Sequence, residues 1–314
     1  MAHTVRFRHE SQTEFVKAFR PLSERHSSWQ AWADFVTLAA ITIAAPFGVP
    51  DDERHRERAA EYQSIMGRYD KREQMVFSEL FALTVNALEE NPEQDFLGEM
   101  FMALDMGNHW KGQFFTPYDI CKLMAMMSMQ DVGARIEAKG WVGICDCCCG
   151  AGALLIAARN IMHFSNPPIG HLPGHQQALF VCQDVDRVAG LMCYIQLSLL
   201  GCAGYVVIGN ALTHPLVGFN NNPVLPVETE GQETWCMPMF HDQIWVWRQT
   251  LAKMEALFQA VPVGAISDNI TIEGTGEIAT ESMEAPLPLP PPMEPEPEQT
   301  QEFSVTATGQ LTLF

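Results

Sequence analysis

The stretch ICDCCCGAGALLIAARN, from Ile144 to Asn160, decides how the fold of this chain is interpreted. Val142 to Cys148 is a short apolar run typical of a buried strand, and Ala153 to Met162 continues at helical spacing. The Gly-Ala-Gly between them allows a close approach to a ligand, because glycine has no Cβ to block it. The stretch therefore predicts a strand, a ligand-binding turn and a helix.

Two other interpretations of this turn are weaker. It lacks the third glycine of the dinucleotide-binding fingerprint and the Gly-Lys-Ser/Thr of a phosphate-binding loop. Cys145, Cys147, Cys148 and Cys149 are too closely spaced for one tetrahedral zinc site, and no second cysteine pair follows at a usual distance. We therefore expect no metal, and interpret the cysteines as small buried thiols that line a tight turn.

Downstream of Trp110, strand and helix patterns alternate. Leu179–Val185 and Tyr205–Ile208 have the character of strands, and Val188–Leu200 between them has that of a helix closed by Gly201. Repeats of this kind build a parallel sheet, and ligands bind at the carboxyl ends of its strands. The sequence thus predicts an α/β domain with its site at the Gly-Ala-Gly turn.

Composition limits the class of protein. The 314 residues carry a net charge of −19, which argues against an autonomous basic protein that coats DNA. The apolar run Phe35–Val49 is broken by Pro46 and Gly48 and is shorter than the roughly 18 residues that cross a bilayer, so we expect a buried helix and no membrane association. The N-terminus lacks the apolar core of a signal peptide, and nine cysteines without export imply reduced thiols. We expect a cytoplasmic, nucleoid-associated protein of a bacterium or phage.

The chain divides into four predicted parts. Residues 1–110 form a helical N-terminal region, 111–262 the α/β domain, 263–309 an acidic, Pro-rich linker, and 310–314 a terminal peptide. In the N-terminal region, the charged run at 51–74 is interpreted as a solvated helix face, with DNA contact by its arginines Arg54, Arg56 and Arg58 as the alternative. Trp245 and Trp247, on a later helical segment, are expected to pack in a core or interface rather than stack on bases.

Five stretches together point to one family. In chain order they are DFLGEMF (Asp95–Phe101), KGQFFTP (Lys111–Pro117), DCCCGAG (Asp146–Gly152), LFVCQDVDRVAGLMCYIQLSLLG (Leu179–Gly201) and VVIGNAL (Val206–Leu212). This set resembles the N6-adenine DNA methyltransferases that serve as methylation subunits of type I restriction-modification systems. The resemblance implies a Rossmann-like S-adenosylmethionine-dependent methyltransferase sheet, here abbreviated, preceded by an α-helical N-terminal region, with DNA as a partner.

The same resemblance implies S-adenosylmethionine as the cofactor and assigns residues to it by position. Phe115 and Thr116 would lie near its methionine part, Asp184 would accept bonds from the ribose hydroxyls, and Asn210 would read the adenine edge. Cys147 stands where the family has proline. The complete set of cofactor-binding residues implied is Gln113, Phe115, Thr116, Asp146, Cys147, Gly150, Gly152, Asp184, Val185, Asn210 and Ala211.

The catalytic element of the family is missing from its expected place. The family grips an extruded adenine with Asn/Asp-Pro-Pro-aromatic at the end of a fourth strand. Weak candidates are Asn166-Pro167-Pro168, which has no aromatic residue, and Asn222-Pro223, which has no apolar strand before it. Either the catalytic half is abbreviated, or a second subunit supplies it, or the chain is a non-catalytic binding or adaptor protein on DNA or the clamp.

The terminal QLTLF, Gln310 to Phe314, resembles the peptide by which bacterial polymerases and repair proteins bind the sliding clamp. The residues that this resemblance assigns to partner binding are Gln310, Leu311, Leu313 and Phe314. A short apolar plug on a tether can fill a preformed pocket, with glutamine fixing its register. The sequence therefore predicts the sliding clamp as a further partner.

Overall fold

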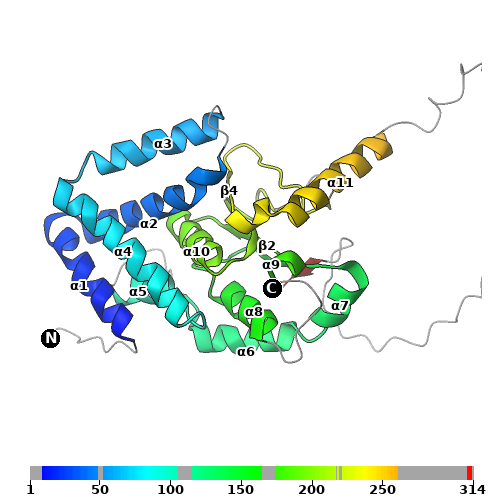
Figure 1. Cartoon of the computed structure of the whole chain (residues 1–314), viewed down its shortest axis with the longest axis horizontal. Coiled ribbons are helices and arrows are strands. Elements are labelled where there is room, and N and C mark those ends of the chain that lie inside the picture. The colour runs from blue at the N-terminus through cyan, green and yellow to red at the C-terminus, as the bar shows by residue number, and fades with distance from the viewer. Residues whose placement is uncertain are drawn as a thin grey trace, which may run out of the picture.

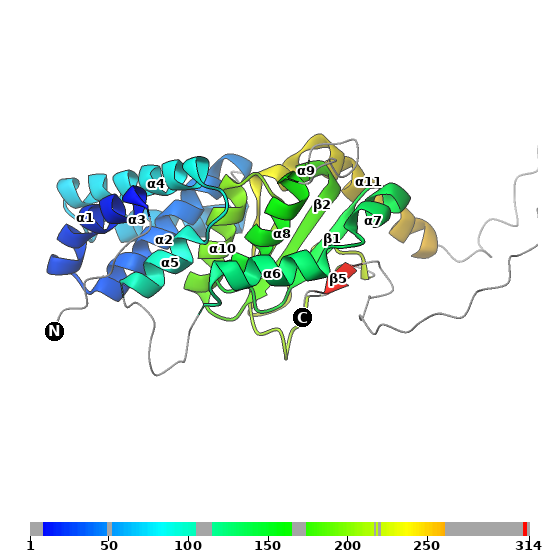
Figure 2. The same cartoon turned by 90° about the horizontal axis from the view of Figure 1, so that it is seen from below.

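The computed structural model describes residues 9–48, 52–104, 115–164, 174–216, 218, 221–260 and 310–312 (Figure 1). A group of N-terminal helices packs beside a sheet with helices on both faces (Figures 1 and 2). The predicted architecture, an α/β sheet preceded by a helical region, is confirmed. The N-terminal elements are α1 (Glu10–Arg25), α2 (Ser28–Ala44), η1 (Ala45–Phe47), α3 (Glu53–Met66), α4 (Lys71–Glu90) and α5 (Phe96–Ala103).

Aromatic side chains form the centre of the N-terminal helical group. The ring of Phe15 on α1 packs edge-on against Trp32, Phe35 and Phe96, with centroids 5.5–5.9 Å apart. All four side chains are almost completely buried. Such edge-to-face contacts add to the stabilisation from burying large apolar surfaces, so they hold α1, α2 and α5 together.

Helix α2 contains most of the apolar run expected to be a buried helix. The segment Ser28–Phe47 is long and apolar enough by length and composition to cross a membrane, although 56% of it is buried within the protein. The apolar helical segment therefore begins well before Phe35, where the run predicted from the sequence starts. Burial of Trp32, Phe35 and Val36 is nonetheless what a core helix shows, because these side chains contact neighbouring helices rather than solvent.

The sheet follows as a second group of elements, with the strand order β4-β3-β2-β1-β5. β1, β2 and β3 are parallel, β5 pairs in parallel with β1, and β4 is antiparallel to β3. The elements are α6 (Tyr118–Ser128), α7 (Val132–Lys139), β1 (Val142–Asp146), α8 (Ala153–Phe164), α9 (Gly174–Gln177), β2 (Ala178–Asp184), α10 (Arg187–Leu199), β3 (Ala203–Ile208), β4 (Glu233–Cys236), η3 (Pro238–His241), α11 (Gln243–Ala260) and β5 (Gln310–Thr312).

Each face of the sheet has its own apolar core, as the alternation of side chains along a strand requires. Ile144, Phe180 and Val206 belong to the large core, which continues through α8 and α10 into the N-terminal helices. Val181 and Tyr205 belong to a smaller core on the other face, together with Phe240 and Trp245.

The two tryptophans of α11 have different environments. Trp245 is completely buried, and its indole Nε1 donates to the carbonyl oxygen of His175 at 2.6 Å, as expected for a packing residue. Trp247 is 59% exposed. The packing interpretation therefore holds for Trp245, whereas Trp247 remains accessible from solvent.

Candidate functional site

The carboxyl ends of β1, β2 and β3 form one edge of the sheet. Asp146 ends β1 and Asp184 ends β2, and the strand register places Asp184 opposite Ile208 at the end of β3. The backbone N–H of Gly209 donates to the carbonyl oxygen of Asp184 at 2.9 Å, which continues the pairing to the tip of the edge. A parallel sheet binds ligands at this edge, so the two aspartates are at the position expected for a site.

The glycine turn after β1 depends on two positive φ angles. Gly150 has φ +54° and Gly152 has φ +94°, conformations that residues with a Cβ rarely adopt. A Cβ on Gly150 would lie 3.1 Å from the ring of Phe115, and one on Gly152 would lie 2.9 Å from the Sγ of Cys193. The turn therefore needs glycine for its backbone angles and to admit Phe115 and α10.

Hydrogen bonds from the turn end on the two strand-end carboxylates. The N–H of Gly150 donates to Oδ2 of Asp184 at 2.8 Å, and the N–H of Cys148 donates to Oδ1 of Asp146 at 3.0 Å. Each carboxylate oxygen has two lone pairs, so these bonds leave capacity for a ligand. The arrangement fixes the turn and still presents acceptors.

Burial raises the pKa of both carboxyl groups. It raises the pKa of Asp146, and the nearby charge of Asp184 raises it further, whereas the N–H of Cys148 lowers it. Burial also raises the pKa of Asp184, against the effect of the donors Asp186 N–H and Gly150 N–H. Two partly desolvated carboxylates at one edge favour a ligand that brings positive charge.

Two cavities meet beside the glycine turn. One, of about 350 Å³, is lined by residues of the turn, of α6 and of α8. The other, of about 410 Å³, is lined by residues of α5 and the segments flanking it. Both are lined by Asp95, Phe115 and Thr116, so the cavities adjoin. The lining of the first is Asp95, Phe115, Thr116, Cys121, Met124, Asp146, Cys147, Cys148, Cys149, Gly150, Ala151, Ala153 and Leu154.

The first cavity brings together five of the residues proposed from the sequence: Phe115, Thr116, Asp146, Cys147 and Gly150. Two more are close to it. Gly152 is buried in the same turn, and Asp184 accepts the Gly150 hydrogen bond. Residues far apart in the chain therefore converge on one side of β1.

The remaining proposed residues do not line this cavity. Val185 is 70% exposed after β2. Asn210 is exposed after β3, and its Oδ1 accepts from the N–H of Leu212 at 2.9 Å, which closes a local turn next to Ala211. Gln113 lies outside the described residues. The described residues thus line a cavity around the glycine turn, whereas Val185 and Asn210 after β2 and β3 are exposed.

Asp95 is not among the site residues that the sequence predicts. It precedes α5 in the N-terminal helical group, yet it lines both cavities. The stretch DFLGEMF, which contains it, was noted only as part of the family resemblance. That stretch could have indicated Asp95 as a candidate site residue. Its position beside the glycine turn is visible only in the folded chain.

The cysteines around the turn have different environments. Cys147 and Cys148 are exposed, whereas Cys149 and Cys193 are buried. Burial raises the pKa of Cys145 to about 12, so that thiol is protonated at neutral pH and is a poor ligand and nucleophile. Within the part of the chain that the structure describes, no group of three or more His, Cys, Asp or Glu side chains could hold a metal ion.

The two weak catalytic candidates gain no support from the site geometry. Asn166, Pro167 and Pro168 lie outside the described residues. Asn222 and Pro223 lie in the connection between β3 and β4, where the Asn222 Oδ1 accepts from the N–H of Val224 and the Pro223 carbonyl oxygen accepts from the Tyr205 hydroxyl. Asn222 and Pro223 are not among the residues that line the two cavities, and their catalytic role stays a prediction.

The terminal peptide is described only at Gln310–Thr312, where β5 pairs with Gly143–Cys145 of β1 (Figure 2). Leu313 and Phe314 lie outside the described residues. β5 therefore covers one edge of β1 while β2 covers the other.

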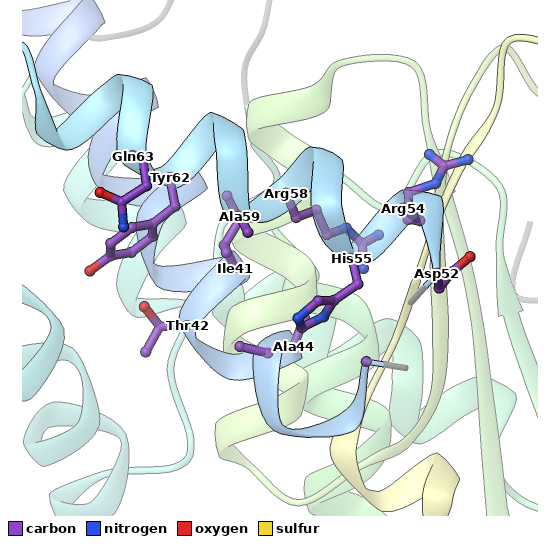
Figure 3. Close-up of a pocket in the computed structure, with 12 residues that line it drawn as sticks. Ile41, Thr42, Ala44, Asp52, Arg54, His55, Arg58, Ala59, Tyr62 and Gln63 are labelled. Atoms are coloured by element: carbon purple, nitrogen blue, oxygen red, sulfur yellow. The ribbon is translucent and has the colours of Figure 1, made fainter. Parts of the chain in front are cut away.

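A third cavity, of about 380 Å³, lies between α2 and α3 and shares no lining residue with the other two (Figure 3). Arg54 and Arg58 of α3, considered above for DNA contact, line it. Arg54 forms an ion pair with Glu228. The guanidinium of Arg58 lies 3.6 Å from the centroid of Trp235 and donates to the carbonyl oxygen of Thr234 at 2.8 Å. These contacts fasten α3 to β4, whereas Arg56 is exposed.

Comparisons with known proteins identify one family. Residues 94–255 match the N-6 DNA methylase family, a segment that begins next to Asp95 and contains the glycine turn and the parallel strands β1, β2 and β3. A structure from Listeria monocytogenes, described as a class I S-adenosylmethionine-dependent methyltransferase, aligns with 18% identity and a TM-score of 0.34. The alignment covers 67% of this chain and 56% of that one. None of the curated proteins matches.

Proposed function

Because the chain belongs to the N-6 DNA methylase family, we propose that it is an S-adenosylmethionine-dependent DNA methyltransferase that modifies adenine at N6. Family membership implies the cofactor. The observation that carries the proposal is the cavity in which Phe115, Asp146 and Gly150 meet at the carboxyl edge of the sheet, within the matched segment.

The residues present fit this cofactor. A neutral nucleoside needs a hydroxyl acceptor rather than a phosphate cradle, and Asp184 is a carboxylate with free lone pairs beside the turn. The methionine end carries a sulfonium and an ammonium cation beside one carboxylate and so has a net positive charge, and the described residues that line the cavity include the carboxyls of Asp95 and Asp146 and no Lys, Arg or His. A side chain on Gly150 would meet Phe115, so the bare backbone there keeps the space open.

When bound, the cofactor supplies a methyl group on sulfonium that an adenine amine can displace directly. The chain's own part in this step is to bind and orient. The turn from Cys147 to Gly150 and the ring of Phe115 would hold the methionine end, and the exposed residues Val185 and Asn210 would lie toward the nucleoside. An extruded base would reach the methyl group from the exposed side.

A second candidate, a cofactor-binding adaptor without catalysis, is favoured by one specific observation. Among the described residues, no Asn/Asp-Pro-Pro-aromatic sequence follows any strand at the carboxyl edge. A second subunit that supplies this element would reconcile the two candidates. It would have to present a polar group and an aromatic ring to the base beside Asp146 and Phe115.

Recruitment to the sliding clamp is the other part of the proposal. It is supported by the sequence of the terminal peptide, Gln310–Phe314, and places the protein on replicating DNA in the cytoplasm of a bacterium or an infected cell. Since Gln310–Thr312 pair with β1, the peptide would have to leave that edge before entering a clamp pocket.

The proposal is tested by methyl transfer to DNA. The full-length protein is incubated with radiolabelled S-adenosylmethionine and either mixed-sequence duplex DNA or a duplex without adenine, and the labelled nucleoside is identified after digestion. We expect N6-methyladenine only from DNA that contains adenine. Cofactor binding without transfer would support the adaptor, and absence of cofactor binding would refute both candidates.

A further inference from the structure

The side chain of Asp95 is a buried carboxyl group at the start of α5. Its side chain is 2% exposed, and it caps α5 by accepting the N–H of Gly98 on Oδ1 at 3.0 Å. The same oxygen accepts from Nε2 of Gln196 at 2.8 Å. Among the described residues no donor lies on the other oxygen, Oδ2. Asp95 lines both cavities, so a ligand there that donates a hydrogen bond to Oδ2 would be stabilised by this carboxylate.

Gln196 ties Asp95 to the glycine turn. This α10 side chain is completely buried, and its Nε2 donates to the carbonyl oxygen of Ala151 at 2.9 Å as well as to Asp95. Its Oε1 accepts from the N–H of Leu97 at 3.0 Å. One amide therefore connects the start of α5, helix α10 and the turn. The carboxyl of Asp95 is fixed relative to the cavity and does not depend on a flexible side chain.

Among the described residues, no Lys or Arg lines the cavities around Asp95. Asp146 and Cys121 line the first of them with Asp95. Glu99 lies on the adjoining side, and Glu93, Asp119 and His9 line the second cavity. Burial and, to a smaller extent, the charge of Glu99 outweigh the two donors on Oδ1 and raise the pKa of Asp95 to about 6. At neutral pH the carboxyl is therefore mostly ionised, and no Lys or Arg among the described residues that line the cavities pairs with it.

We infer that Asp95 binds the α-ammonium group of the methionine part of the cofactor through Oδ2. This inference rests on the proposed function. An ammonium group offers three N–H donors to a carboxylate, whereas a sulfonium has none and attracts it by charge alone. The reacting sulfonium must also be within reach of the base in DNA, whereas Asp95 is a 2% exposed side chain packed against Gly98 of α5. Asp95 is thus a cofactor-binding residue contributed by the N-terminal helical group.

Gly98 is part of the same arrangement. A Cβ at this position would lie 2.0 Å from Oδ2 and 2.6 Å from Cγ of Asp95. The carboxyl therefore lies directly over the α-carbon of Gly98 and needs a residue without a side chain there. This requirement gives a physical reason for a glycine three residues after the aspartate.

The inference is tested by calorimetric affinities for three ligands. S-adenosylmethionine has both cations, S-adenosylhomocysteine keeps only the ammonium, and 5′-methylthioadenosine lacks the amino-acid part. We expect Asp95→Asn, which keeps the shape and the acceptor on Oδ1, to weaken the first two roughly 10- to 100-fold, as loss of a charge-assisted hydrogen bond would. Affinity for 5′-methylthioadenosine should not change.

Asp131→Asn is the matched control, because it makes the same chemical change at an exposed carboxyl that lines neither cavity. All three affinities should stay within twofold in this variant. If Asp95→Asn weakens only S-adenosylmethionine, Asp95 recognises the sulfonium and the assignment is wrong. Equal weakening of all three ligands would indicate a structural role and would also overturn it, as would no change in any.

A measurement on the unaltered protein covers the case in which the variant does not fold. As the pH falls below about 6, Asp95 becomes protonated. The ratio of affinities for S-adenosylhomocysteine and 5′-methylthioadenosine should then fall, and a ratio constant between pH 5 and pH 7.5 would overturn the inference. If the unaltered protein binds none of the three ligands, the proposed function itself fails, an outcome distinct from the ones above.

Discussion

Gly150 and Asp184 are joined by a 2.8 Å hydrogen bond from the backbone N–H of the glycine to Oδ2 of the aspartate, across 34 positions of sequence. This bond ties the turn after β1 to the end of β2. Asp184 therefore has two tasks, since it fixes the turn and also offers lone pairs to a ligand. The family resemblance assigned it only the second.

The double task of Asp184 makes its replacement informative. Asp184→Ala should weaken binding of S-adenosylmethionine by about 1.5 to 3 kcal/mol, because a charged acceptor is lost and the Gly150 N–H loses its partner. Isothermal calorimetry measures this loss, with Asp131→Asn, an exposed carboxyl before α7, as the control. Equal affinity of Asp184→Ala and the unaltered protein would contradict the assignment.

Gly150→Ala tests the turn itself. The positive φ costs a residue with a Cβ about 1 to 2 kcal/mol, and the new methyl group would press on the Phe115 ring. We expect a lower free energy of unfolding in urea and weaker cofactor binding. Gly174→Ala is the matched control, because a Cβ there meets no atom within 4 Å and should change neither quantity by more than about 0.5 kcal/mol.

Arg58→Ala tests the contact between α3 of the N-terminal helical group and β4 of the sheet. The substitution removes the cation–π contact with Trp235 and the hydrogen bond to Thr234, so the free energy of unfolding should fall by about 1 to 3 kcal/mol. The exposed neighbour Arg56→Ala should have little effect. If Arg58→Ala were as stable as Arg56→Ala, the contact would be energetically unimportant.

The pKa of Asp95 predicts how stability depends on pH in the ligand-free protein. Its folded value of about 6 lies above that of an unfolded aspartate, about 3.9, so the folded state binds more protons between these values. Stability contributed by this group is therefore present below about pH 4 and is lost as the pH rises through 6, by the order of 3 kcal/mol.

Asp95→Asn should remove this term, because an amide does not titrate in that range. Urea unfolding of the unaltered protein and the variant at pH 4.5 and pH 7 isolates it, since all other groups titrate in both proteins. The stability of the variant relative to the unaltered protein should rise between pH 4.5 and pH 7. A relative stability that is constant with pH would show that Asp95 has an ordinary pKa.

Deletion of Gln310–Phe314 tests recruitment to the clamp. We expect loss of retention on immobilised bacterial sliding clamp, with at most a small fall in the unfolding midpoint, because the described part of the peptide pairs with β1 over three residues. The paired substitution of Gln310 and Phe314 by alanine should act as the deletion does, while leaving the chain length intact. Retention of either variant on the clamp would refute the proposed role of the peptide.

Local patterns in the sequence were sufficient for the parallel part of the sheet. The helix expected at Ala153–Met162 is α8, and the strands expected near Leu179–Val185 and Tyr205–Ile208 are β2 and β3, with ends shifted by one or two residues. The glycine turn was also identified correctly. These features are set by neighbours in sequence, through periodic apolar residues and the special backbone angles of glycine.

Contacts between distant parts of the chain were beyond the reach of those patterns. Nothing local indicates that Asp95 accepts a hydrogen bond from Gln196, 101 positions away, or that Arg58 lies on the ring of Trp235. The family resemblance assigns Asn210 to the adenine edge, and only the fold shows that its side chain is exposed and accepts the N–H of Leu212. The strand order β4-β3-β2-β1-β5 depends likewise on which edges pair.

The sequence by itself thus determined the elements, the glycine turn and the family to which the chain belongs. Only the tertiary structure decided which side chains surround the turn, and that the N-terminal helices contribute a buried carboxyl to it. The physical reason is that backbone preferences act over a few residues, whereas burial and its effect on charge depend on every segment that packs around a group.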